Sequence, residues 1–128
     1  MSANDQTAVH VLVVDDSEVF RNVLCAVVAA TPGFEVVGVA SSGRETLTVI
    51  GSLAVDLVLV DVKLPDLDGI ETGLRIRRRH PNVVVVVLTA ATHAYGRDSS
   101  PMVEDKRDLS PERLDELWRQ RSLKPLER

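Results

Sequence analysis

Residues 58–69 read VLVDVKLPDLDG. An apolar run ends at Asp61, and Pro65, two further acids and Gly69 follow it. A short run of aliphatic residues bounded by turn residues is typical of a buried β-strand. We therefore expect a strand over residues 55–60 that holds the carboxylate of Asp61 at its exposed tip.

Four more segments have the same apolar character, and amphipathic segments separate most of them. The predicted strands are Val9–Val14, Phe34–Ala40, Val83–Leu88 and Met102–Glu104. Continuous apolar strands that alternate with helices indicate a parallel sheet covered on both faces. Right-handed crossovers make such a sheet doubly wound, so the predicted fold class is α/β.

Helix starts are marked by capping residues. Ser17 precedes a 3.6-residue apolar pattern, and Ser42 with Glu45 forms a capping box. Ser110 and Pro111 give a third start, a cap followed by proline at the first helical position. The residues expected to face inward are Phe20, Val23, Leu24, Val27 and Val28, then Leu47 and Ile50, then Ile70, Gly73 and Leu74 of a helix over 70–79, and finally Leu114, Leu117 and Trp118.

Composition limits the function classes. The 128 residues suffice for one domain, which we place at residues 9–122 between a flexible N-terminus (1–8) and a C-terminal tail or linker remnant (123–128). The net charge of −4 argues against nucleic-acid binding by this domain. The single cysteine, Cys25, excludes an internal disulfide, and no apolar run has the length of a membrane span. A cytoplasmic protein with no membrane contact is expected.

Chemistry-bearing residues stand where four of the predicted strands end. They are Asp15 and Asp16, then Asp61, then Thr89, then Lys106. Ligands of doubly wound sheets bind beyond the carboxyl ends of the strands. Crowded carboxylates repel one another unless a cation lies between them, and oxygen-only ligands favour Mg²⁺, with Mn²⁺ as an alternative ion. A carboxylate, a hydroxyl and a lysine around that ion suit the transfer of a phosphoryl group.

These residues, in this order, resemble the receiver domain of bacterial two-component response regulators. The acidic pair matches Asp15 and Asp16, and the phosphoacceptor motif matches Asp61 with Pro65, Asp68 and Gly69 of the following turn. The family's Thr or Ser matches Thr89, and its lysine matches Lys106. The resemblance implies a flavodoxin-like sheet with strand order 2-1-3-4-5.

The resemblance also implies a role for each position. Asp61 would accept a phosphoryl group from a sensor histidine kinase or a phosphotransfer protein. Mg²⁺ would be held by Asp61, Asp16 and the backbone carbonyl of Lys63, with Asp15 assisting. Thr89, the small Ala90 beside it and Lys106 would bind the phosphoryl group and report it. The side chains of Lys63 and Ala91 would tune its lifetime.

The stretch between Thr89 and Lys106 departs from the family pattern. Residues 90–105 carry no apolar stripe of helical period, and this gap before the lysine is several residues shorter than is usual in the family. A crossover needs only about 10–12 residues, so the connection can close with a fourth helix that is short or disordered.

Val103 stands where the family places an aromatic switch residue, and Tyr95 or His93 is a candidate substitute. We therefore expect a change in the surface that the family usually uses for output and for dimerisation. Dimerisation of this chain is possible.

Several alternatives remain at this point. Asp61 alone is an ordinary turn former, and we interpret Asp66 and Asp68 as turn formers. The chain is expected to be no turnover enzyme, although a phosphoacceptor can catalyse its own phosphorylation and dephosphorylation. A pseudo-receiver that only binds proteins, a small aspartyl-phosphate hydrolase, and the receiver half of a longer DNA-binding regulator are the rivals. A stand-alone receiver acting on an unknown downstream protein is preferred.

Overall fold

The computed structural model describes residues 8–90 and 102–121, with Met102 described by its backbone alone. The strands are β1 (Val9–Val14), β2 (Phe34–Ala40), β3 (Leu57–Asp61), β4 (Val84–Thr89) and β5 (Met102–Asp105). The helices are α1 (Glu18–Ala29), α2 (Gly43–Val49), α3 (Gly69–Arg79) and α4 (Pro111–Gln120), with short 3-10 turns η2 (Ile50–Ser52) and η4 (Lys106–Asp108). The predicted third strand began too early, because Val55 and Asp56 precede the ladder, and Asp61 is its last member.

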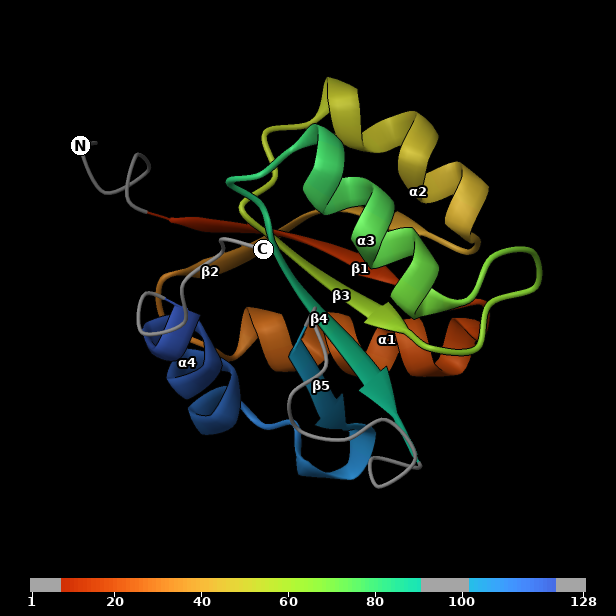
Figure 1. Ribbon diagram of the computed structural model, residues 1–128. Helices are drawn as coiled ribbons and strands as arrows, with labels where there is room; N and C mark the ends of the chain where they lie inside the picture. The colour runs from red at the N-terminus through yellow and green to blue at the C-terminus, as the bar shows by residue number, and fades with distance from the viewer. Residues whose placement is uncertain (1–7, 91–101, 122–128) are drawn as a thin grey trace.

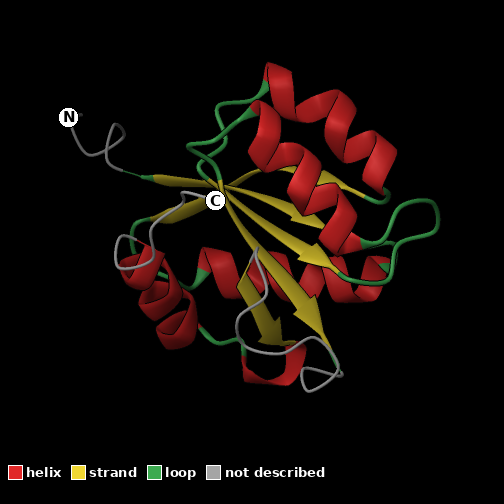
Figure 2. Ribbon diagram, in the orientation of Figure 1, coloured by secondary structure: helices red, strands yellow, loops and turns green. Residues whose placement is uncertain are grey.

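The strands form one parallel sheet in the predicted order β2-β1-β3-β4-β5. Figure 1 shows α2 and α3 on one face of this sheet and α1 and α4 on the other. Figure 2 shows the strand arrows pointing the same way, so that their carboxyl ends lie along one edge. The switch in strand order falls between β1 and β3, which places Asp15 and Asp61 at the topological switch point.

Alternate side chains of each strand enter two separate cores. Val13 and Leu59 lie in the core under α1 and α4, whereas Val14 and Val60 lie in the core under α2 and α3. Since side chains alternate along a strand, Asp15 lies on the same face as Val13, and Asp61 lies on the same face as Leu59. Both carboxylates therefore belong to the face that α1 covers.

Capping of the helices follows the sequence signals. The hydroxyls of Ser17, Ser42 and Ser110 each accept a backbone N–H three residues on, and Asp68 does the same for α3. Glu45 accepts from the backbone N–H of Ser41, one residue before the cap, and so completes a variant of the predicted capping box.

Two burial predictions were wrong. Val23 is 50% exposed, whereas Leu24 and Val28 are the fully buried residues of α1. In α3 the buried side chains include Thr72 and Ile76, whereas the predicted Leu74 is only partly buried. The Thr72 hydroxyl donates to the carbonyl of Asp68 at 2.9 Å, which satisfies a polar group that the hydrophobic pattern does not count.

The predicted short or disordered fourth helix falls almost entirely on residues 91–101, which lie outside the described residues, as do Ala91, His93 and Tyr95. Residues 1–7 of the predicted N-terminal segment and the predicted tail at 123–128 lie outside them as well, so these two predictions stay untested. In the part of the chain that is described, none of the helices combines the length and apolar character needed to cross a bilayer.

Candidate functional site

The acidic pair lies at the end of β1. The backbone N–H of Asp15 donates to Ala40 at 3.1 Å, which extends the ladder beyond Val14 and fixes the position of Asp15. One Asp15 carboxylate oxygen, Oδ1, accepts the N–H of Ser17 at 2.9 Å. Oδ2 is buried and has no hydrogen-bond partner. Asp16 is exposed, on the open side of the pair.

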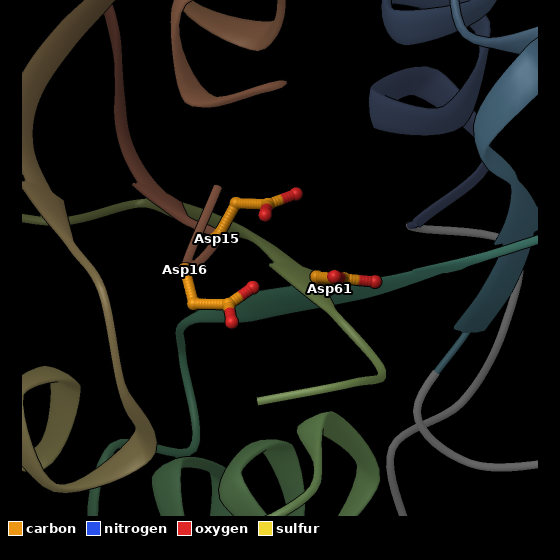
Figure 3. Close-up of side chains that lie close together, drawn as sticks. All are labelled: Asp15, Asp16 and Asp61. Atoms are coloured by element: carbon orange, nitrogen blue, oxygen red, sulfur yellow. The ribbon is translucent and has the colours of Figure 1, made fainter. Parts of the chain in front are cut away.

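Asp61 completes an acidic cluster with this pair. Asp15, Asp16 and Asp61 each offer an oxygen, and the three oxygens lie within 4.8 Å of one another. Figure 3 shows the three carboxylates approaching one another from the ends of β1 and β3. Two are buried and one is exposed, so the cluster is open to solvent on the Asp16 side.

The electrostatics of this cluster are unfavourable for three anions. Burial raises the pKa of Asp61 above its ordinary value, and the nearby charge of Asp15 raises it further. Lys106 and the backbone N–H of Lys63 act in the opposite direction but do not cancel the increase in pKa. A cation at the cluster would relieve the repulsion.

Lys106, which follows β5, brings a positive side chain to two of the carboxylates. Its Nζ lies 3.6 Å from Asp15 Oδ2 and 3.5 Å from Asp61 Oδ1, and its side chain is 14% exposed. These distances are those of ion pairs longer than a good hydrogen bond. The ammonium is therefore not held at short hydrogen-bond distance by either carboxylate.

The fourth strand supplies the hydroxyl. Asp61 pairs with Leu88 across β3 and β4, so Thr89 lies one position beyond Asp61 on the neighbouring strand. Thr89 also pairs with Asp105, directly before Lys106, and its side chain is buried. Ala90 follows it and is exposed. The parallel register thus brings Thr89 to the same edge as the carboxylates and the lysine.

The turn after Asp61 depends on a glycine. Gly69 donates its N–H to the carbonyl of Val62 at 2.8 Å, which brings the first turn of α3 against the end of β3. A Cβ at this position would collide with the carbonyl oxygen of Asp61 and lie 2.9 Å from Val62 Cα. Pro65 and Lys63 are exposed in the loop between them.

Sequence reasoning missed the role of Asp66. Its carboxylate accepts the backbone N–H groups of Gly43 and Arg44, each at 2.9 Å, and therefore caps α2 from a loop more than twenty residues away. These hydrogen bonds hold the pKa of Asp66 at about 2. A signal was present in the acid-rich turn, but no local pattern identifies a cap on a different helix.

Acid titration should expose this tie between the loop and α2. A carboxylate whose pKa is lowered by folding stabilises the fold above its ordinary pKa, and the contribution disappears as the pH falls toward 2. Asp66→Asn should therefore unfold at lower urea than the wild type at pH 6, and the two midpoints should converge near pH 2. Fluorescence of Trp118, the single tryptophan, monitors the unfolding. A difference that is constant between pH 6 and pH 2 would contradict the assignment.

The cluster fits a divalent ion. Its donors are oxygens alone, and one buried oxygen, Asp15 Oδ2, has no hydrogen-bond partner among the described residues, so a bound cation would satisfy it. The fold and this acidic cluster together define a doubly wound α/β domain with a carboxylate site for a hard cation beside a lysine. A family model described as "Response regulator receiver domain" matches residues 11–98. The chain belongs to this family, whose members are the phosphoacceptors of two-component signalling.

Curated relatives share the same portion of chain. A protein-glutamate methylesterase/protein-glutamine glutaminase of Anaeromyxobacter dehalogenans is 40% identical over 94 residues, which is 73% of this chain and 28% of that protein. The response regulator GacA of Pseudomonas viridiflava is 41% identical over 81 residues, which is 63% of this chain and 38% of that protein. This chain thus spans well under half of these relatives.

Solved structures agree on the fold. The response regulator domain of Thermotoga maritima CheB has a TM-score of 0.76 and 25% identity, and the match covers 92% of this chain and 99% of that one. The response regulator TrrA of Thermotoga maritima, solved in complex with Mg²⁺ and BeF, has a TM-score of 0.74 and 28% identity over 88% of this chain and 97% of that one. The predicted family and strand order are confirmed.

Proposed function

We propose that this receiver takes its phosphoryl group on Asp61, from a phosphohistidine of a sensor kinase or a phosphotransfer protein. The observation that carries the proposal is the position of Asp61 within 4.8 Å of Asp15 and Asp16 oxygens and 3.5 Å from the Lys106 ammonium. A buried carboxylate with a raised pKa is a better nucleophile than an exposed one, provided that it stays ionised.

The proposed reaction is a direct displacement at phosphorus. An oxygen of Asp61 forms the new O–P bond as the N–P bond of the donor breaks, and the bonding pair leaves on the imidazole nitrogen. Asp15, Asp16, Asp61 and the backbone carbonyl of Lys63 would hold Mg²⁺, which when bound neutralises charge on the transferring group.

Two cationic or polar side chains complete the proposed site. The Lys106 ammonium stands 3.5 Å from Asp61, where it can contact an oxygen of a phosphoryl group attached there. The hydroxyl of Thr89, with space provided by Ala90, would take a second oxygen. The exposed side chain of Lys63 and that of Ala91 would set how readily water reaches the acyl phosphate.

The signalling role follows from the same proposal. Phosphorylation would change the surface near Thr89 and Lys106, and an unidentified downstream protein or a second copy of the chain would bind the changed surface. The chain would act as a relay and not as a turnover enzyme. Family membership supports the predicted cytoplasmic location.

Incubation with a small phosphodonor tests the function. We expect one phosphoryl group per chain by intact-protein mass spectrometry in the presence of Mg²⁺, and none after chelation with EDTA. No adduct and no beryllofluoride binding would indicate a pseudo-receiver, whereas continuous release of phosphate over many turnovers would indicate a hydrolase. Because fast self-hydrolysis resembles the latter, saturable beryllofluoride binding with Mg²⁺ serves as the control.

A further inference from the structure

The side chain of Phe20 lies against the lysine of the site. The Nζ of Lys106 stands 3.7 Å from the centroid of the Phe20 ring, within the range of a cation–π contact. Phe20 belongs to α1, whereas Lys106 follows β5, so the pair joins segments that are far apart in the sequence. The hydrophobic pattern assigned Phe20 only to the core.

The ammonium has two kinds of neighbour. The carboxylates of Asp15 and Asp61 lie 3.6 and 3.5 Å away, and the ring lies at a similar distance. The side chain is only 14% exposed, so the aromatic face occupies space that water would otherwise fill. An ammonium that lacks a full hydration shell interacts more strongly with a π-face than an exposed ammonium does.

The position of the ring is fixed by the site itself. Asp15 accepts the N–H of Ser17, and the Ser17 hydroxyl accepts the N–H of Phe20 at 3.2 Å. The first turn of α1 is thereby attached to the acidic pair, and Phe20 packs on the core under α1 and α4. The ring can thus hold the ammonium at a defined place relative to Asp15 and Asp61.

We propose that Phe20 is a positioning residue whose ring face holds the Lys106 ammonium between Asp15 and Asp61, ready to contact a phosphoryl group on Asp61. The inference rests on the proposed function, because it assigns to Lys106 a phosphoryl oxygen as its partner. The ring keeps the Lys106 side chain beside Asp15 and Asp61 before the anion arrives. The side chain therefore loses less conformational freedom when the anion binds.

The contact is tested first in the free protein. An aromatic ring shifts the resonances of protons above its face upfield, so the Lys106 ε-protons should be shifted in the wild type. Phe20→Leu keeps an apolar side chain and removes the ring face, and it should return these resonances to ordinary positions. Phe34→Leu is the matched control, because Phe34 packs edge-on against Trp118, at the other end of the same core. It should leave the Lys106 shift unchanged.

The consequence is tested with beryllofluoride and Mg²⁺. We expect Phe20→Leu to weaken beryllofluoride binding by roughly 3- to 10-fold, in line with the strength of a partly buried cation–π contact. Phe20→Tyr, which retains the ring face, should restore binding to within about twofold of the wild type, and Phe34→Leu should remain within the same range.

Fluorinated phenylalanines at position 20 separate a cation–π contact from simple packing. Each added fluorine withdraws electron density from the ring face while the shape changes little, so affinity should fall stepwise with fluorine number. A flat series, or an equal loss in Phe34→Leu, would overturn the positioning role. Failure of the wild type to bind beryllofluoride would overturn the proposed function and, with it, that role; an upfield shift of Lys106 would still identify the contact.

Discussion

Asp61→Asn should take up no phosphoryl group from a small phosphodonor in the presence of Mg²⁺, under conditions where the wild type becomes singly modified. The substitution keeps the shape of the side chain and removes the nucleophilic carboxylate. It also removes one of the three negative charges of the acidic cluster and leaves a neutral amide oxygen in its place. Intact-protein mass spectrometry measures the adduct, and the expected loss is complete.

The substitution should not unfold the protein. Burial and Asp15 raise the pKa of Asp61, so ionisation destabilises the fold fully above that raised pKa, and the penalty disappears once the pH falls below the ordinary pKa of an aspartate. Asp61→Asn should therefore raise the free energy of unfolding at pH 7, with a smaller gain at acid pH. Urea unfolding monitored by Trp118 fluorescence checks the sign.

A second aspartate of the same region supplies the control. Asp56 precedes β3 at the opposite end from Asp61, and its carboxylate accepts the N–H of His10 at 2.9 Å. Asp56→Asn should keep full phosphorylation. An adduct that persists in Asp61→Asn would place the acceptor elsewhere and contradict the proposed function.

Gly69→Ala should damage both stability and the site. The new methyl group would meet the carbonyl oxygen of Asp61 and the Cα of Val62, which are backbone atoms that cannot rotate away. Overpacking of this kind typically costs about 1–3 kcal/mol. Because the relief requires the end of β3 or the start of α3 to move, Mg²⁺ affinity should fall as well. Urea unfolding and calorimetric titration with Mg²⁺ measure the two effects.

Gly51→Ala is the matched control for this prediction. A Cβ at Gly51 would meet no atom within 4 Å, and the residue lies in the short turn η2. Its replacement should change the free energy of unfolding by no more than about 0.5–1 kcal/mol, with a gain in stability as the expected sign. Equal losses in the two variants would show that the loss at Gly69 does not come from the collision and would contradict the prediction.

The sequence predicted the features that depend on neighbours along the chain. The strand ending at Asp61 and the caps Ser17, Ser42 and Ser110 follow from local patterns, and the structure confirms them. Because parallel strands end at one edge, their order along the chain also predicted that Asp15, Asp16 and Lys106 would approach Asp61. Those side chains lie at the predicted edge.

Other features depended on residues that meet only in the folded chain. Asp66 looked like a turn former and proved to cap α2, and Phe20 looked like a core residue and proved to cover the lysine. Val23 matched the helical period and is half exposed, because the angle at which α1 crosses the sheet decides which positions reach the core. Periodicity reports which residues share a face of one element. The register, packing angle and approach of separate elements arise from long-range contacts, so the tertiary structure alone decided that Asp66 caps α2 and that Phe20 lies against Lys106.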